Sequence, residues 1–302
     1  MKLKITKKHS MENEPLVGLL FLLPSLLGCL VFYFFPVVFS LIISLFKWNL
    51  SIGANNLKFV GFQNYIGIFR DNIFTASLIN TIIFTVSTVV IGISISLILA
   101  VLIAKTAFLK NAIKSMFFMP YISSIVAVSI VWMVLLQPSY GPVNQFLMSI
   151  GIQNPPKWFI DVHWALPSLI AMFIWQNLGY NVIVFAAGLS GISQDLYEAA
   201  DIDGASGVRK FLAITVPMIS PTTFFLSIMG IINSFKVFDQ VQVITQGGPG
   251  TATSVLALYI YKEAFQFYQM GYASASAWVM LFIIFIVTVI QWKQQKGWVV
   301  YD

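Results

Sequence analysis

Six long apolar stretches constrain the fold of this 302-residue chain more than any other feature. A helix that crosses a bilayer needs about 20 mostly apolar residues. Stretches of that kind cover residues 17–45, 77–104, 113–136, 165–188, 216–238 and 272–292. Hydrophobic residues make up 58% of the chain and charged residues 9%, whereas soluble domains carry about 25% charged residues. The sequence therefore predicts an all-α polytopic membrane protein with six transmembrane helices.

The first apolar stretch follows a basic N-terminus, which is also the position of a signal peptide. It runs from Leu16 to Phe46, and no small-x-small cleavage site follows it. The apolar region of a signal peptide has roughly 7–15 residues, so we expect a retained first span. Pro24 and Pro36 allow one end of this long stretch to lie at the membrane interface. Pro120 predicts a kink in the third span, where neighbouring helices can satisfy the freed carbonyl.

The positions of Lys and Arg predict how the six spans are oriented. Membrane proteins concentrate these residues in cytoplasmic loops. With the N-terminus in the cytoplasm, the larger group lies inside: Lys2, Lys4, Lys7, Lys8, Lys105, Lys110, Lys114, Arg209, Lys210, Lys293 and Lys296. The smaller group lies outside: Lys47, Lys58, Arg70, Lys157, Lys236 and Lys262. We therefore expect both termini in the cytoplasm, and we interpret the net charge of +6 as topology rather than nucleic-acid binding.

The outside loops and the span ends carry aromatic and turn-forming residues. The three predicted outside loops cover 46–76, 137–164 and 239–271. Trp48, Trp158 and Trp164 are expected in an outer aromatic belt, and Trp292 and Trp298 in an inner one. In the last loop, residues 247–250 (GGPG) form a turn cluster. The amphipathic stretch from Leu256 to Phe267 predicts a short helix that lies against the membrane surface.

A polar segment lies between the fourth and fifth spans, on the predicted cytoplasmic side. Residues 197–204 read YEAADIDG. Asp195 and Glu198 have the spacing of a capping box, which predicts Asp195 as the N-cap of a short helix over about 195–203. Gly204 suits the left-handed residue that closes a helix.

A second helical piece is expected after that bend. It runs through Arg209 and Lys210, and it is followed by residues 214–217 (ITVP). Pro217 predicts a break where the fifth span begins. A membrane protein that builds a capped helix into so short a loop presents that helix to another molecule, although a plain connector is the alternative.

The segment resembles the EAA loop of permeases in binding-protein-dependent ABC importers. The residues that match are Glu198, Ala199, Ala200, Gly204, Ile214, Val216 and Pro217, with Val216 where that family prefers Leu. A second run resembles the branch that imports maltose, lactose, glycerol phosphate and multiple sugars. It comprises residues 245–249 (TQGGP), Tyr259, Tyr261, Ala264, Phe265 and residues 271–273 (GYA). The resemblance extends from about Leu16 to the C-terminus.

This resemblance implies an ABC importer type I permease fold in a bacterial-type plasma membrane. The chain then divides into a cytoplasmic tail (1–15), a first span with its external loop (16–76), a five-helix core (77–292) with the loop 189–217, and a cytoplasmic tail (293–302). Its implied partners are a second permease, which we expect to be a different chain, two ATPase subunits that hold ATP and Mg²⁺, and an extracytoplasmic sugar-binding protein. Lipid surrounds the spans, and the chain itself holds no cofactor or metal.

The resemblance also implies which residues couple the chain to its ATPase. They are Glu198, Ala199, Ala200, Asp203, Gly204 and Pro217. Ala199 and Ala200 are small and favour helix, so the helix can enter a groove. Glu198 either holds the N-terminus of the helix or meets a basic group on the ATPase, and the two roles can coexist.

Other chemistry is missing from the sequence. His9 and His163 lie in unrelated places, Cys29 is the single cysteine, and no HExxH, no GxSxG and no Gly-Lys-Ser/Thr phosphate loop occurs. No Asp, Glu, Lys or Arg falls in the middle of a predicted span, whereas ion-coupled carriers place ionisable groups there. Transport would therefore need an external motor. An intramembrane enzyme, a scaffold and a secondary carrier are the rival classes.

Polar residues inside two spans suggest the path of the solute. Amides donate and accept hydrogen bonds with hydroxyl groups, and aromatic faces stack on sugar rings. The candidates are Gln176, Asn177, Tyr180 and Asn181 in the fourth span and Asn233, Ser234, Lys236 and Asp239 at the outer end of the fifth. The alternative is that these groups only join helices to one another. A permease for an amino acid, a polyamine or an anion also remains open, although a polyamine path should show acidic residues.

Overall fold

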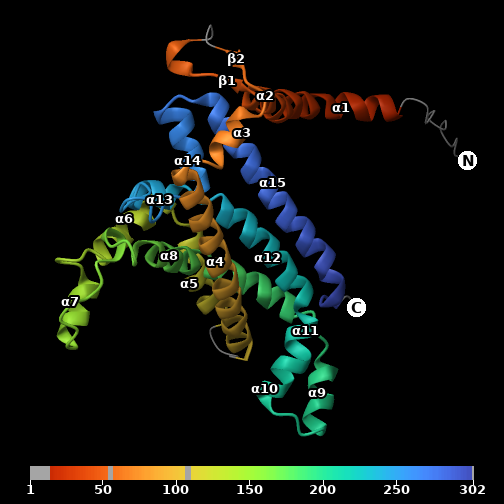
Figure 1. Ribbon diagram of the computed structural model, residues 1–302. Coiled ribbons are helices and arrows are strands. Elements are labelled where there is room, and N and C mark those ends of the chain that lie inside the picture. Colours follow the sequence, from red (N-terminus) through yellow and green to blue (C-terminus); the bar gives the residue numbers. More distant parts are fainter. Residues whose placement is uncertain (1–13, 54–56, 106–109, 301–302) are drawn as a thin grey trace, which may run out of the picture.

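The computed structural model is a bundle of helices with one small β-hairpin, and it describes residues 14–53, 57–105 and 110–300 (Figure 1). The α-helices are α1 (Glu14–Cys29), α2 (Phe35–Ser44), α3 (Gln63–Ile68), α4 (Asn72–Lys105), α5 (Lys110–Ile122), α6 (Ile125–Leu135), α7 (Pro142–Ser149), α8 (Ala165–Leu189), α9 (Gln194–Ile202), α10 (Gly207–Lys210), α11 (Val216–Met218), α12 (Ser220–Phe235), α13 (Asp239–Ile244), α14 (Leu256–Tyr261) and α15 (Met270–Gln294).

Short 3-10 and π-helical turns and two strands lie between or beside these helices. β1 (Phe46–Lys47) and β2 (Lys58–Phe59) pair antiparallel, with Phe46 opposite Phe59. We call this end of the bundle the hairpin end and the opposite end, which carries α9 and α10, the α9 end (Figure 1). Most of the predicted tail 1–15, including Lys2, Lys4, Lys7, Lys8 and His9, lies outside the described residues.

Six stretches of the described chain are long and apolar enough to cross a membrane, if a bent pair of helices counts as one. The five continuous spans are Gly18–Ser44, Asn72–Ala104, Ala165–Leu189, Ser220–Ile244 and Met270–Gly297. The sixth consists of Ala112–Ile122 and Ile125–Leu135, which meet at 97°. The predicted number and order of spans are confirmed. The fifth span begins at Ser220 rather than at residue 216, and it includes α13, which the sequence placed in an outside loop.

The bend in the third span lies beyond the proline that was expected to cause it. Pro120 remains inside α5, in its last turn, and the chain turns at Ser123 and Ser124. Ser124 has an extended ψ of 125° before α6 begins, and Ser123 Oγ donates to the carbonyl of Met119 (2.8 Å). Proline removes one helical hydrogen bond. The last turn of α5 is therefore weakened, and the helix ends after the proline instead of kinking at it.

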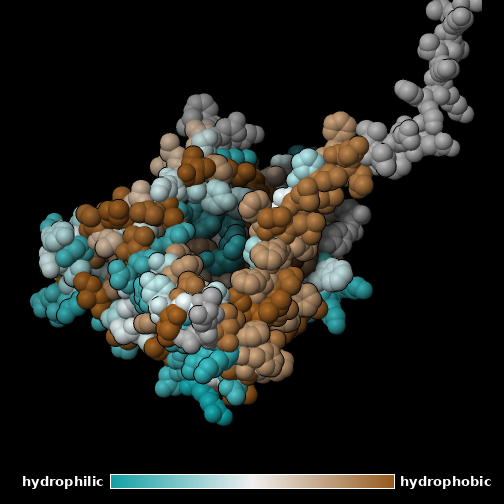
Figure 2. Space-filling model, turned by 90° about the horizontal axis from the view of Figure 1, so that it is seen from above, coloured by the Kyte–Doolittle hydropathy of each residue, from teal (hydrophilic) through white to brown (hydrophobic). Residues whose placement is uncertain are grey.

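α1 and α2 form an arm that projects from the bundle (Figure 1). Only 6% of the apolar window in this span is buried. The arm is attached through α2, which packs on α15, where Trp278 Nε1 donates to Ser40 Oγ (3.2 Å). Viewed from above, the arm is almost uniformly brown (Figure 2). Most of its apolar surface thus has no protein partner within the described chain.

Buried hydroxyl groups on α4 join it to distant parts of the chain. Ser77 Oγ bonds Ser254 Oγ (2.7 Å), and Thr81 Oγ1 accepts the N–H of Leu256 (2.9 Å). Further along α4, Thr88 Oγ1 bonds Ser234 Oγ of α12 (2.8 Å). Hydrogen bonds of this kind between membrane helices contribute about 0.6–2 kcal/mol each. The row fixes α4 against α12 and against the loop before α14.

The segment 256–267 is helical, as predicted, but its surroundings differ from the prediction. Leu256, Leu258 and Tyr259 of α14 are buried, because α14 packs on α4 and α15. The expected helix on the membrane surface is therefore wrong for this part, and the apolar face packs against the protein itself. The turn cluster before it is confirmed, with positive φ at Gly247 (92°) and Gly250 (59°).

Candidate functional site

The exposed segment at the α9 end begins with a well-formed helix cap, although not at the predicted residue. Ser193, in extended conformation, is the N-cap of α9, and its Oγ accepts the N–H of Asp195 (3.3 Å). Asp195 lies in the first turn, where a carboxylate is favoured by the helix dipole. The predicted capping box of Asp195 with Glu198 is therefore wrong. Glu198 lies one turn further into α9, and its side chain is free to face other groups.

The C-terminal end of α9 closes as predicted. Gly204 has φ +67°, its N–H bonds the carbonyl of Asp201 (3.1 Å), and the N–H of Ala205 bonds the carbonyl of Ala200 (2.9 Å). This pair of bonds is a Schellman motif, with Asp203 at the C-cap. A residue with a Cβ atom is strained at this φ, so glycine sets the reversal of the chain.

Side chains then hold the second helical piece against α9. Lys210 Nζ pairs with Asp201 Oδ1 at 2.5 Å. Tyr197 Oη bonds Thr215 Oγ1 at 3.0 Å. Ser206 is the N-cap of α10, so both short helices in the segment have a Ser cap. The sequence reading did not find these contacts, because the pairs are nine to eighteen residues apart and only the bend at Gly204 brings them together.

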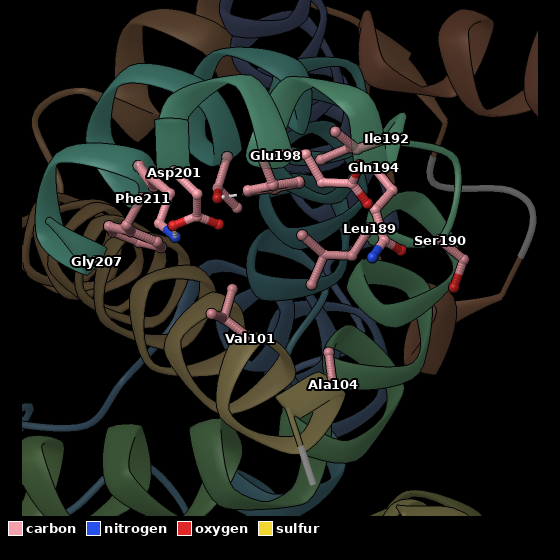
Figure 3. A pocket seen from close by; sticks show the side chains of 13 residues that line it. Val101, Ala104, Leu189, Ser190, Ile192, Gln194, Glu198, Asp201, Gly207 and Phe211 are labelled. Carbon is pink, nitrogen blue, oxygen red and sulfur yellow. Dashed lines mark hydrogen bonds and ion pairs between the residues drawn. The ribbon is translucent and has the colours of Figure 1, made fainter. Parts of the chain in front are cut away.

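A cavity of about 550 Å³ lies between this segment and the bundle (Figure 3). Val101 and Ala104 of α4 and Leu189 of α8 form its apolar side, and Glu198 and Asp201 of α9 line it opposite (Figure 3). The other predicted coupling residues lie elsewhere: Ala199, Asp203 and Gly204 are exposed, and Ala200 and Pro217 are half-buried.

Large apolar side chains in the segment face away from the bundle. Ile202 is 88% exposed, Val208 70% and Leu212 61%. These three residues lie within eleven positions of a short polar loop, and exposed apolar side chains that gather in one place mark surfaces for partners. The sequence reading passed over them, because it considered the motif residues and not their apolar neighbours.

A narrow groove between α4, α8 and α12 brings together most of the predicted path residues. Asn177, Tyr180 and Asn181 of α8 line it together with Asn233 and Ser234 of α12. Its free volume is about 30 Å³, which is the size of one water molecule. A sugar ring does not fit in the groove of the single chain.

Three of the predicted path residues are not part of this groove. Gln176 is buried, and its Oε1 has no hydrogen-bond partner among the described residues. Lys236 and Asp239 are exposed at the ends of α12 and α13. The sequence reading missed the third wall, which comes from α4 and includes Thr88 and Gly92.

Two close contacts position Tyr180 in the groove. Gly179 lies against α5 so closely that a Cβ atom would come within 1.9 Å of the carbonyl oxygen of Phe117. The Tyr180 ring stacks on Tyr121, with 5.0 Å between centroids and 20° between planes. Tyr121 stands next to the bend of the third span. The tight crossing of α5 and α8 therefore places an aromatic pair between the bend and the groove.

Two carboxyl groups meet at the hairpin end, outside the spans. Tyr259 Oη donates to Asp71 Oδ2 (2.6 Å), and Glu263 is only 9% exposed. Burial, together with the nearby Asp71 charge, raises the pKa of Glu263 to about 7. Burial also raises the pKa of Tyr259. Within the described residues, no group of three or more His, Cys, Asp or Glu side chains has the arrangement of a metal site.

The comparisons with known proteins agree with this architecture. Residues 92–295, which contain most of the groove and the whole α9 segment, match the model of the family described as "Binding-protein-dependent transport system inner membrane component". The lactose transport system permease protein LacF of Rhizobium radiobacter is 34% identical, over 91% of this chain and 92% of that protein.

Two further relatives come from Bacillus subtilis. The probable ABC transporter permease protein YurN is 33% identical over 93% of this chain and 97% of that protein. The arabinooligosaccharides transport system permease protein AraP is 31% identical over 91% of this chain and 87% of that protein. A chain in the crystal structure of a bacterial alginate ABC transporter, in complex with an alginate-bound periplasmic protein, has the same fold, with a TM-score of 0.81, 23% identity and 94% of each chain covered. The chain therefore belongs to the family of inner membrane components of binding-protein-dependent transport systems.

Proposed function

We propose that this chain is the permease subunit of an ATP-driven ABC importer that translocates a sugar or an oligosaccharide delivered by an extracytoplasmic binding protein. The observation that carries the proposal is the α9 segment, which is closed at both ends by caps and presents Ile202, Val208 and Leu212 to a partner. Relatives named for lactose and arabinooligosaccharide transport support the sugar assignment.

The α9 segment is the part of this chain that binds the ATPase. The sequence contains no Gly-Lys-Ser/Thr phosphate loop, so two partner ATPases hold ATP and Mg²⁺ and the chain itself does no chemistry. Ile202, Val208 and Leu212 enter a groove of the ATPase, and Glu198 and Asp201 face the cavity behind them. This role puts α9 and the C-terminal end of α15 (Figure 1) on the cytoplasmic side of a bacterial-type plasma membrane, and we propose the same side for the N-terminus.

The groove between α4, α8 and α12 is this subunit's half of the solute path. Amide groups of Asn177, Asn181 and Asn233 supply donors and acceptors for hydroxyl groups, and Tyr180 supplies an aromatic face. None of the described residues that line it is Asp, Glu, Lys or Arg. An unpaired charge is costly to bury, which favours an uncharged saccharide on this side of the path.

A second permease, a different chain, completes the pore. The arm of α1 and α2 leaves most of its apolar surface uncovered, and the groove is too narrow for a sugar in the single chain. Another bundle of helices that packs beside this one covers the apolar surface of the arm and supplies the missing wall of the solute path.

Affinity purification tests the proposal. Tagged wild-type protein in mild detergent should retain an ATPase and a second permease, identified by mass spectrometry. A variant with Gly204→Ala and Glu198→Ala should lose the ATPase alone, while Gly207→Ala should retain it, because Gly207 has no positive φ and open space around it. Wild-type protein that purifies without any ATPase would favour a self-contained carrier.

The solute path is tested by separate substitutions in its walls. Asn177→Ala, Asn233→Ala and Tyr180→Ala should each weaken the apparent affinity of uptake without loss of ATPase binding. Asn72→Ala, at the exposed start of α4, is the matched control. Unchanged apparent affinity of uptake in all three groove variants would show that the groove is not part of the solute path.

A further inference from the structure

The C-terminal segment after α15 follows one face of α12. Within the last turns of α15, Gln291 Nε2 bonds Ser227 Oγ (3.5 Å), and beyond α15 the Trp298 ring packs edge-on against Phe224, with 6.1 Å between centroids. Ser227 and Phe224 are three residues apart in α12, so they share a face of that helix. The segment after α15, residues 295–300, which we call the tail, therefore packs against α12.

The last contact of the tail falls on the junction between the α9 segment and α12. The backbone N–H of Val300 donates to Ser220 Oγ (2.9 Å), and the same hydroxyl donates to the carbonyl of Pro217 (2.6 Å). Ser220 is only 3% exposed. Its hydroxyl thus connects three pieces of chain: the tail, the short helix α11 and the first turn of α12.

The helical geometry changes twice at this junction between the α9 segment and α12. The chain passes from a π-helical turn (Phe211–Thr215) into the three-residue helix α11, and Ile219 leaves helical geometry with ψ near 0° before α12 starts. A broken helix of this kind can absorb motion at the break. Without a brace, a movement of α9 would be lost here instead of reaching α12.

We propose that Trp298 and Val300 form a strap that locks this junction, so that the α9 segment and α12 move as one body. The strap rests on the proposed coupling function of the α9 segment. Trp298 and Val300 are positioning residues, since they act through Phe224 and Ser220 and touch neither solute nor nucleotide.

Distances between spin labels in the purified complex test the strap. One label replaces Asp195 on α9 and the other replaces Phe225 on α12, both exposed, in a Cys29→Ser background. In the wild-type tail, the distance distribution should stay narrow and unshifted when Mg-ATP and vanadate are added. Trp298→Ala should broaden it roughly twofold, and Trp298→Phe should restore it. Trp292→Ala, an exposed tryptophan of α15, should leave it narrow.

A second variant keeps the test decisive if Trp298→Ala fails to assemble. Val300→Pro removes the N–H group that bonds Ser220, and it should broaden the same distribution. Distributions that stay narrow in both variants would overturn the strap. The proposed function fails in a different way, since a wild-type chain that purifies without an ATPase contradicts it before any label is attached.

Discussion

Lys210 of α10 forms an ion pair with Asp201 of α9, with 2.5 Å between Nζ and Oδ1, and so closes the exposed segment on itself. The Asp201 side chain is 62% exposed, and exposed pairs contribute at most about 1 kcal/mol. Asp201→Asn should therefore leave the thermal midpoint of the whole protein almost unchanged but raise amide hydrogen exchange in residues 194–210. Asp195→Asn, which breaks no ion pair, is the control. A large fall in the midpoint would show that the pair holds more than this segment.

Gly204→Ala should damage transport more than global stability. At φ +67° a Cβ atom costs about 1–2 kcal/mol, and this cost falls on the Schellman motif that ends α9. We expect loss of ATPase binding and of uptake with a small change in unfolding temperature. The matched variant Gly207→Ala should behave as wild type, because its added methyl group meets nothing within 4 Å. Equal behaviour of the two variants would contradict the role of the left-handed turn.

Gly179→Ala should act in the opposite way and destabilise the bundle. Its Cβ atom would lie 1.9 Å from the carbonyl oxygen of Phe117, so α5 and α8 must move apart. Overpacking of this kind costs about 1–3 kcal/mol or more, and the stack of Tyr121 on Tyr180 should separate with it. Thermal unfolding in detergent measures the effect. Gly92→Ala is the control, because its nearest neighbour, Ile174, is at an ordinary 3.8 Å.

Glu263 should make stability depend on pH. Its pKa rises from the ordinary 4.5 to about 7 in the folded protein, so the folded state retains a proton that the unfolded state has lost. The contribution of Glu263 to the free energy of unfolding should be fully present below about pH 4.5. It should fall as the pH rises and level off above about pH 7. The total change is at most ~3 kcal/mol. Unfolding midpoints from pH 4.5 to 8 should show this slope in wild type and not in Glu263→Gln. If the unfolding midpoint of Glu263→Gln shows the same slope with pH, another titratable group causes it.

The sequence predicted local features of the fold better than tertiary ones. The left-handed Gly204 and the order of the spans follow from signals within a few residues, and both are confirmed. The N-cap was assigned to Asp195 instead of Ser193, because both residue types cap helices and only the direction in which the chain leaves α8 decides between them. The burial of α14 depends on α4 and α15, and no local pattern contains that information.

The candidate site shows the same division. Asn177 and Asn233 were predicted to belong to one solute path because both are amides inside apolar spans, and the structure brings them into one groove. Lys236 and Asp239 were grouped with them by sequence proximity alone. They lie outside the groove because α12 ends at Phe235 and the chain turns before α13.

The 97° bend at Ser123 and Ser124 limits where lipid can touch this protein. Each half of the bent span contributes eleven residues, or about 17 Å of helix, against about 30 Å of hydrocarbon. Neither half reaches across, and the backbone groups at the corner cannot be left facing acyl chains. Because Tyr121 and Tyr180 stack beside this corner, the bilayer must be held away from it by protein or by water. The corner therefore faces protein or water, and the acyl chains of the bilayer do not reach it.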